Sequence, residues 1–355
     1  MIVDNTDGES TPMTILDATS YQLHDLDSIE FPPSLIEIDL TANRLNKLDS
    51  RISNLSNLKK LSLRQNLLDD AGVEPISQII QGRSVHLVLD LAPALRKGQG
   101  GAGSLHDLMY VALPGTFELV LRDNQLKNIP DVSIFKSLLV FDVSFNEISS
   151  MSGLSKASNT LKELYVSKNE VTKIEEIEHF HELQILELGS NRIRVMENMQ
   201  NLTNLQELWL GRNRIKSINL CGLKGIQKLS LQSNRLTSMK GLEECTSLEE
   251  LYLSHNGIAK MEGLSTLINL RVLDVSSNKL AAIEDIEKLT RLEDLWFNDN
   301  QLASLDGISE AVSGSREKLT TIYLENNPCA KSSDYLTTLK EIFPNIEQID
   351  SELFA

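Results

Sequence analysis

Residues 183–202 of this chain read LQILELGSNRIRVMENMQNL, and this stretch decides the fold. Around Leu186 its apolar residues alternate with outward-facing ones, which is the period of a short β-strand. After Asn191 the apolar residues recur at every third position, beginning with Ile193 and Met196. That spacing suits a 3₁₀-like turn better than an α-helix. The stretch therefore predicts a short strand, a turn at an asparagine and a return segment.

The same pattern repeats along almost the whole chain, which contains 59 leucines in 355 residues. Repeats of this size cannot bury an apolar face alone, so they stack into a solenoid. The asparagine amide both donates and accepts, so it can pair with backbone groups that the turn buries. From Asn124 to Asn300 the equivalent asparagines are 21 to 23 residues apart. The full set is Asn43, Asn66, Asn124, Asn146, Asn169, Asn191, Asn213, Asn234, Asn256, Asn278, Asn300 and Asn327.

The sequence thus predicts an α/β leucine-rich-repeat solenoid, a curved, right-handed array of about 12 to 13 repeats of 22 residues. We expect a parallel β-sheet on the concave face and 3₁₀ or short helical turns on the convex face. Residues 1–12 are expected to form a disordered tail, and residues 13–34 a degenerate capping repeat with Tyr21 in the asparagine position. Repeats follow over residues 35–329. Residues 330–355 leave the period and predict a C-terminal helical cap over the last open core face.

One step breaks the period, because Asn66 and Asn124 are 58 residues apart. The simplest interpretation is a single repeat split by an insertion of about 36 residues within residues 76–116. Such an insertion either changes the local curvature or reflects a mis-spliced transcript. The alternative is a second, poorly matching repeat around residues 85–91. The stretch GQGGAG at residues 98–103 matches G-x-G-x-x-G, but no strand–turn–helix context surrounds it, so we interpret it as a surface loop.

Charge and composition exclude several classes of function. The chain has 50 acidic and 34 basic residues, which gives a net charge of −16. Phosphate backbones and anionic lipids would repel it, so neither nucleic acid nor a membrane is an expected partner. Its start is acidic and its apolar runs are short, and its three cysteines show no ligand spacing. We expect a soluble protein of a reducing, intracellular compartment.

No group of residues in the sequence points to catalysis, to a cofactor or to a metal. The nearest metal candidate is His179 with His181, but no cysteine lies beside them, so we interpret them as a solvated pair. Serines such as Ser144 and Ser254 follow several strands, yet a residue type repeated at one position belongs to the architecture. We therefore expect no catalytic residue, no cofactor and no metal site.

The most informative feature is the outward residue between the two strand leucines. This row holds both tryptophans and three tyrosines, out of 17 aromatics in the chain, interleaved with five acids. Strand propensity accounts for tyrosines but not for two exposed tryptophans. Aromatic anchors in an acidic field are typical of a face that binds a basic protein surface. The row is Asp17, Asp39, Ser62, Val120, Asp142, Tyr165, Glu187, Trp209, Ser230, Tyr252, Asp274, Trp296 and Tyr323.

A second row lies two positions earlier and is also acidic. Its acids are Glu118, Glu163, Glu207, Glu250 and Asp294. Strands lie about 4.8 Å apart, so two tryptophans four repeats apart stand roughly 19 Å apart. A span of that size fits a folded protein surface better than a small molecule.

The chain also carries a family resemblance. The runs LELGSNRI at residues 186–193 and LYLSHNGI at residues 251–258, with the Phe-Pro cap at residues 343–350, resemble the regulatory subunit 7 family of protein phosphatase 1. The resemblance is to a plant-type member and covers nearly the whole chain apart from the insertion and the first dozen residues. It implies a non-catalytic, inhibitory subunit of the nucleus and cytoplasm, whose concave face binds the phosphatase catalytic subunit. It also suggests a further phosphatase inhibitor protein in a ternary complex.

Carried over position by position, the resemblance implies contacts that fall on the two rows already described. Tyr165 and Trp209 stand where animal members typically have phenylalanine, and Asp294 where they have glutamate. The alternative is a scaffold of another intracellular complex, because spliceosomal and tubulin- or dynein-associated proteins share similar repeats and caps. With Tyr252 added from the outward row, the expected partner-binding residues are Asp142, Tyr165, Glu187, Trp209, Tyr252, Asp274, Asp294, Trp296 and Tyr323.

Overall fold

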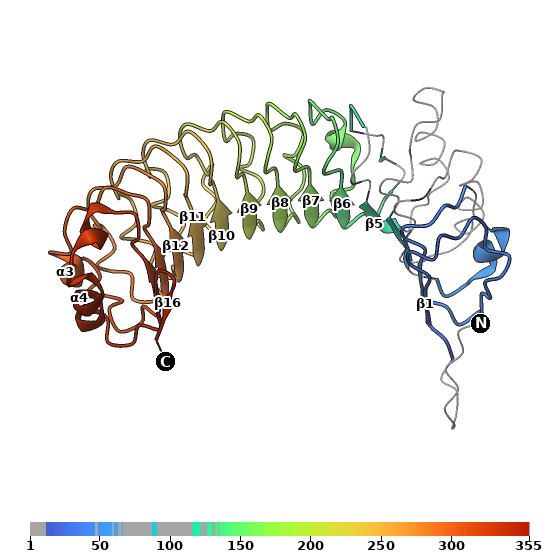
Figure 1. Ribbon diagram of the computed structural model, residues 1–355. Helices are drawn as coiled ribbons and strands as arrows, with labels where there is room; N and C mark the ends of the chain where they lie inside the picture. The colour runs from blue at the N-terminus through green and yellow to red at the C-terminus, as the bar shows by residue number, and fades with distance from the viewer. Residues whose placement is uncertain are drawn as a thin grey trace. The chain divides into compact units, whose positions relative to one another are not determined.

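The computed structural model describes residues 12–46, 49–58, 60–62, 66, 87–90, 116–120, 122, 126–129, 132–133 and 135–354. The chain forms two compact units, of which the first carries the N-terminal strands and the second everything from residue 159 onward (Figure 1). Residues 127–129 and 147–155 also belong to the second unit, and residues 156–158 to the first. Each unit is a stack of repeats with a parallel sheet, which confirms the predicted repeat fold.

The first unit contains six strands that pair in chain order. All of these pairings are parallel, and the middle leucine or isoleucine of β2 and β3 is fully buried, as the two-residue period predicts. A 3₁₀ helix, η1 (Ser50–Asn54), follows β2 on the return segment. The strands are β1 (Ile15–Asp17), β2 (Glu37–Asp39), β3 (Lys60–Ser62), β4 (Leu87–Asp90), β5 (Thr116–Val120) and β6 (Val140–Asp142).

Strand β4 bears on the two interpretations of the long step. It pairs in parallel with β3, where Leu61 lies opposite Leu89, and with β5, where Leu89 lies opposite Leu119. Residues 87–90 thus occupy the strand position of an additional repeat. This finding supports the alternative of a second, poorly matching repeat around residues 85–91 over a single split repeat. The glycine-rich stretch at residues 98–103 lies outside the described residues, as does the tail at residues 1–11.

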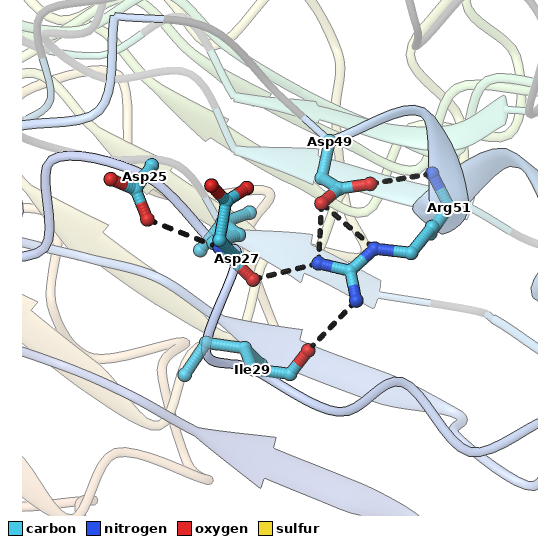
Figure 2. Close-up of polar contacts among 6 residues, drawn as sticks. Asp25, Asp27, Ile29, Asp49 and Arg51 are labelled. Carbon is cyan, nitrogen blue, oxygen red and sulfur yellow. Dashed lines mark hydrogen bonds and ion pairs between the residues drawn. The ribbon is translucent and has the colours of Figure 1, made fainter.

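The capping repeat is tied to the next repeat by one arginine. Arg51 donates from Nη2 to the carbonyl of Leu26 at 2.7 Å and from Nη1 to the carbonyl of Ile29 at 3.2 Å. Figure 2 shows its guanidinium between Asp49 and Ile29. Asp49 accepts from Nε of the same guanidinium at 2.9 Å. The guanidinium carbon also lies 5.2 Å from the ring centroid of Phe31. One side chain therefore joins two carbonyls of the capping repeat to the repeat that follows it.

The second unit continues the same architecture with ten strands. Strands β7 to β15 pair in parallel and in chain order, and β16 closes the sheet as an antiparallel strand. In Figure 1 these strands lie side by side along the concave side of the unit. They are β7 (Glu163–Tyr165), β8 (Ile185–Glu187), β9 (Glu207–Trp209), β10 (Lys228–Ser230), β11 (Glu250–Tyr252), β12 (Val272–Asp274), β13 (Asp294–Trp296), β14 (Thr321–Tyr323), β15 (Gln348–Ile349) and β16 (Glu352–Leu353).

Repeat asparagines bond neighbouring repeats together. Nδ2 of Asn191 donates to the carbonyls of Leu188 at 3.0 Å and of Val166, one repeat earlier, at 2.9 Å, while Oδ1 accepts from the N–H of Val171 at 2.9 Å. Removing such a buried amide leaves three backbone groups short of a partner, which costs about 1–3 kcal/mol. Asn43, Asn66, Asn146, Asn169, Asn213, Asn234, Asn256, Asn278, Asn300 and Asn327 likewise accept a backbone N–H from the preceding repeat.

The backbone turns sharply just before ten of the repeat asparagines in the described part of the chain. Residues at this position, including Ser190, Arg212 and Ser233, adopt a left-handed conformation with φ near +56°. The convex side is built mostly from successive i→i+3 turns, such as Phe180 N–H to Ile177 O and then Leu183 N–H to Phe180 O. That bonding explains the three-residue apolar spacing. Three 3₁₀ helices are assigned in the described chain, namely η1, η3 (Leu154–Lys156) and η4 (Pro328–Lys331).

The C-terminal end departs from the repeat as predicted. Helix α4 (Tyr335–Ile342) buries Leu339 against the last repeat, and Tyr335 OH donates to Asp350 Oδ2 at 2.8 Å. Helix α3 (Ile308–Ala311) was not predicted and takes up the extra residues between Asn300 and Asn327. The helical cap over the final repeat is confirmed.

Candidate protein-binding face

The last residue of each strand forms one outward column on the concave face of the second unit. The parallel register places these residues directly opposite one another on successive strands, with about 4.8 Å between strands. The middle residue of each strand is buried, so its neighbours must face outward. In order, the column is Tyr165, Glu187, Trp209, Ser230, Tyr252, Asp274, Trp296 and Tyr323.

Four aromatic side chains of this column touch one another, and we call them the aromatic ladder: Trp209, Tyr252, Trp296 and Tyr323. The rings of Trp209 and Tyr252 stack with centroids 6.3 Å apart, across the strand that carries the small Ser230. Tyr252 and Trp296 meet edge to face at 6.4 Å, and Trp296 and Tyr323 at 5.8 Å. Each such contact contributes about 0.5–1.5 kcal/mol beyond the area it buries. The sequence predicted the residues of this column but not that their rings form a continuous contact.

Acids two residues earlier on the same strands hold several of these rings in place. Trp209 Nε1 donates to Glu207 Oε2 at 3.1 Å, and Tyr252 OH donates to Glu250 Oε2 at 2.9 Å. Burial together with the bond to Glu250 raises the pKa of Tyr252 to about 12. Tyr165 OH makes the matching bond to the glutamate at position 163, at 2.8 Å. The rings are therefore preorganised before any partner arrives, which lowers the entropy lost on binding.

The far end of the ladder is held differently. Tyr323 OH accepts a hydrogen bond from Gln348 Nε2 at 2.6 Å, which links the ladder to the C-terminal cap. Nε1 of Trp296 is buried and has no hydrogen-bond partner among the described residues. The ring of Trp296 contacts two aromatic neighbours, Tyr252 and Tyr323, edge to face.

The acids of this face fall into two groups that the sequence did not separate. Asp274 is only 5% exposed, and its Oδ1 accepts from the N–H and the hydroxyl of Ser276 at 3.0 and 2.6 Å. That carboxylate therefore stabilises the turn that follows its own strand. Glu187 and Asp294 are half-buried and have no side-chain bond to a described residue. These two are the acids best placed to meet a cationic partner.

Lys228 also lies on this face, at a position that the sequence motif does not single out. Its Nζ lies 3.8 Å from Glu207 Oε1 and 3.4 Å from Glu250 Oε1, between the two acids that hold Trp209 and Tyr252. The signal was available, because Lys228 is the first residue of its strand and so shares the outward row of Glu207 and Glu250. The centre of the face is therefore less negative than a count of its acids suggests.

Asp142 lies in the first unit, at the last position of β6. It is 9% exposed, and its Oδ1 accepts from the N–H of Ser144 at 2.8 Å. Arg122 Nη1 lies 3.8 Å from its other oxygen. Asp142 therefore resembles Asp274 in using one oxygen for its own backbone.

The histidine pair is spread over a convex turn. The ring of His179 lies 4.0 Å from that of Phe180, and His181 Nδ1 lies 3.2 Å from the carbonyl of Asn201. Within the described part of the chain, no three His, Cys, Asp or Glu side chains gather as metal ligands. None of the helices described there has the length and apolarity to cross a bilayer.

The comparisons with known proteins agree with this repeat architecture. A family model for leucine-rich repeats in two copies matches residues 203–244, 224–266, 246–288 and 268–310, and a single leucine-rich-repeat model matches residues 54–77. Among solved structures, a leucine-rich-repeat protein of Leptospira interrogans shares 24% identity with a TM-score of 0.69, and covers 94% of each chain. An internalin of Listeria monocytogenes shares 18% identity with a TM-score of 0.63, over 91% of this chain and 87% of its own. These two show the fold alone.

One curated relative is far more similar than these structures. It is a protein phosphatase 1 regulatory inhibitor subunit PPP1R7 homolog of Arabidopsis thaliana, 64% identical over 358 residues. The match covers 99% of this chain and 100% of the relative. It therefore spans both units, including the outward column and the region of the long step.

Proposed function

Because this chain belongs to the regulatory subunit 7 family of protein phosphatase 1, we propose that it binds the catalytic subunit of that phosphatase through the concave face of its second unit. It acts in this proposal as a non-catalytic, inhibitory subunit. The relative's name supports a regulatory role, and the repeat fold is a scaffold type without an active site of its own.

The observation that carries the proposal is the aromatic ladder. Trp209, Tyr252, Trp296 and Tyr323 form one connected apolar strip with prearranged rings. Trp and Tyr are the residues that most often dominate binding free energy at protein interfaces. Glu187 and Asp294 flank the strip and would attract basic side chains of the partner. The strip spans six strands, which suits a folded surface.

Inhibition follows if the bound solenoid covers substrate access or favours one conformation of the phosphatase. We also propose that a further phosphatase inhibitor protein joins in a ternary complex, and that the protein works in the nucleus and cytoplasm. Neither nucleic acid nor a membrane is part of this proposal, since the chain carries a net charge of −16.

The test replaces Trp209 and Trp296 together by alanine and measures the affinity for purified catalytic subunit by calorimetry. Loss of two anchors should weaken binding at least a hundredfold. The matched control replaces Val195 and Ile268, which are 55% and 52% exposed away from the concave face, and should bind normally. A charge variant, Glu187→Lys with Asp294→Lys, keeps all four rings of the aromatic ladder. Weaker binding by this variant would therefore report lost charge attraction and not a loss of packing.

The same purified proteins also distinguish the phosphatase subunit from the alternative, a scaffold of another complex. Unchanged phosphatase binding by the tryptophan variant and the charge variant would overturn the site. A wild-type chain that captures spliceosomal, tubulin or dynein proteins from native extract, and does not bind the phosphatase, would favour the scaffold alternative. Phosphatase activity measured with increasing amounts of the protein then shows whether binding inhibits.

A further inference from the structure

A strongly basic edge lies beside the concave face and has no place in the proposed function. The segments at residues 189–195, 211–217 and 232–238 follow β8, β9 and β10. They read GSNRIRV, GRNRIKS and QSNRLTS, with six basic residues and no acid in a chain of net charge −16. We call this set the basic edge: Arg192, Arg194, Arg212, Arg214, Lys216 and Arg235.

The fold arranges these cations in columns. The residue after each repeat asparagine bonds to the previous repeat in the same way: Arg192 N–H to Val171 O, Arg214 N–H to Ile193 O and Arg235 N–H to Ile215 O, each at 2.8 Å. These three arginines therefore follow one another at the spacing of a parallel ladder, about 4.8 Å. Two positions further on, Arg194 and Lys216 begin a second column, because the intervening isoleucines are fully buried.

Few of the described residues neutralise this edge. Arg192 Nη2 pairs with Glu170 at 2.6 Å, with both side chains 46% exposed. The other five cations form no ion pair with any described residue, and all but the half-buried Arg214 are exposed. Placing like charges on successive repeats raises the free energy of the folded state. A binding partner that supplies the missing anions removes that repulsion.

We infer that the basic edge binds an acidic, unmodified protein segment, a run of Asp and Glu residues lying along the three repeats. Guanidinium groups pair with carboxylates through two parallel hydrogen bonds, and a ladder of them suits an extended chain that offers a carboxylate at each step. The flanking acids Glu170 and Glu187 and the negative chain as a whole disfavour a long polyanion such as nucleic acid. A short peptide segment experiences mainly the local cations, because charges beyond about 10 Å are screened.

The test measures binding of a labelled twelve-residue Glu/Asp-rich peptide by fluorescence anisotropy at low and at physiological salt. The probe should bind the intact protein with an affinity that falls as salt rises. In the variant Arg194→Glu, Arg214→Glu, Arg235→Glu the affinity should fall at least tenfold. A control with the same change in net charge, Lys224→Glu, Lys260→Glu, Lys288→Glu, alters exposed lysines outside the edge and should retain most of the binding.

Several outcomes would overturn the inference. They are no peptide binding by the intact protein, an equal loss in both triple variants, or tighter binding of a phosphopeptide or an oligonucleotide of the same length. The neutral variant Arg194→Gln, Arg214→Gln, Arg235→Gln, checked by circular dichroism, shows that any loss comes from a folded protein. Affinity for the phosphatase catalytic subunit, measured on the same variants, should be unchanged. The proposed phosphatase site and the proposed peptide site are therefore tested independently.

Discussion

The last residue of each strand has the same backbone position in both units, but among the described strands aromatic rings occupy that position in the second unit and not in the first. In the first unit, Asp17 and Asp39 each turn one oxygen to the N–H two residues further along, at 3.0 and 2.9 Å. In the second unit, the equivalent places at Trp209, Tyr252 and Trp296 carry rings that contact each other. The repeat therefore fixes where a side chain points, and the residue at that point decides whether it supports its own turn or faces a partner.

The largest expected effect tests the ring side of this comparison. Tyr252→Ala removes the ring that contacts both tryptophans, so the affinity for the phosphatase catalytic subunit should fall by a factor of 30 or more, about 2–3 kcal/mol. Tyr252→Phe keeps the ring and loses only the bond to Glu250, so it should retain most of the affinity. Titration calorimetry on both variants checks this, and equal losses would assign the effect to the hydroxyl instead.

The next effect tests whether the repeat asparagine stabilises both units to the same extent. Asn191→Ala and Asn43→Ala remove equivalent amides from the second and the first unit. Both should lower the free energy of unfolding in urea by about 1–3 kcal/mol, because each leaves buried backbone groups unpaired. Asn57→Ala, which alters an exposed amide bonded only to Pro33 O, is the control and should have a much smaller effect. A large difference between Asn191 and Asn43 would contradict a common role.

A smaller effect separates carboxylates that support a turn from those that face a partner. Asp39→Ala and Asp274→Ala should each cost about 0.5–1.5 kcal/mol of stability, because a backbone N–H loses its acceptor. Asp274→Asn keeps an acceptor oxygen and removes the charge. If Asp274 also contacts the phosphatase, the asparagine variant should bind more weakly while its thermal unfolding stays unchanged. Asp39→Asn should alter neither quantity.

The smallest effect concerns pH. Glu176 accepts from the Ser155 hydroxyl at 2.7 Å and from the N–H groups of Gly153 and Ser155, and these bonds lower the pKa of its carboxyl to about 2. The ionised form is therefore favoured by folding, so its contribution is present above the unfolded pKa near 4.5 and is lost as the pH falls toward 2. Glu176→Gln should flatten the decline of melting temperature over that window. An identical decline in both proteins would contradict the assignment.

Much of this architecture was predictable because the same sequence motif recurs in each repeat. Buried leucines in the strands and the paired asparagines were expected, and Asn191 and Leu186 lie where the period places them. Strand β4 was harder, because its segment fits the motif poorly and only pairing with both neighbours reveals it. Helix α3 lies in residues that exceed the usual repeat length, and the repeat motif predicts no structure for them.

The site was predictable in position but less so in its contacts. The two-residue period places Trp209 and Trp296 on the outward column, yet whether rings meet depends on the size of the residue between them, here Ser230 and Asp274. The bond from the Asp274 carboxylate to Ser276 depends on a side-chain direction that no spacing encodes, whereas the row that holds Lys228 follows from its place as first residue of its strand. Local rules therefore determine the scaffold, while contacts between repeats determine the character of the face.

The paired asparagines also set how this protein comes apart. The bonds that these asparagines make to another repeat join residues roughly one repeat apart along the chain, so among the described residues this kind of contact links neighbouring repeats. A stack held by nearest neighbours opens from an end, one repeat after another, and each opening exposes the next. The hydrogen bond from Gln348 to Tyr323 then holds the C-terminal cap against the last ring of the aromatic ladder. Opening of the C-terminal cap would break this bond first and release the aromatic ladder from Tyr323 inward, so the stability of strand β15 would influence partner affinity from outside the binding face.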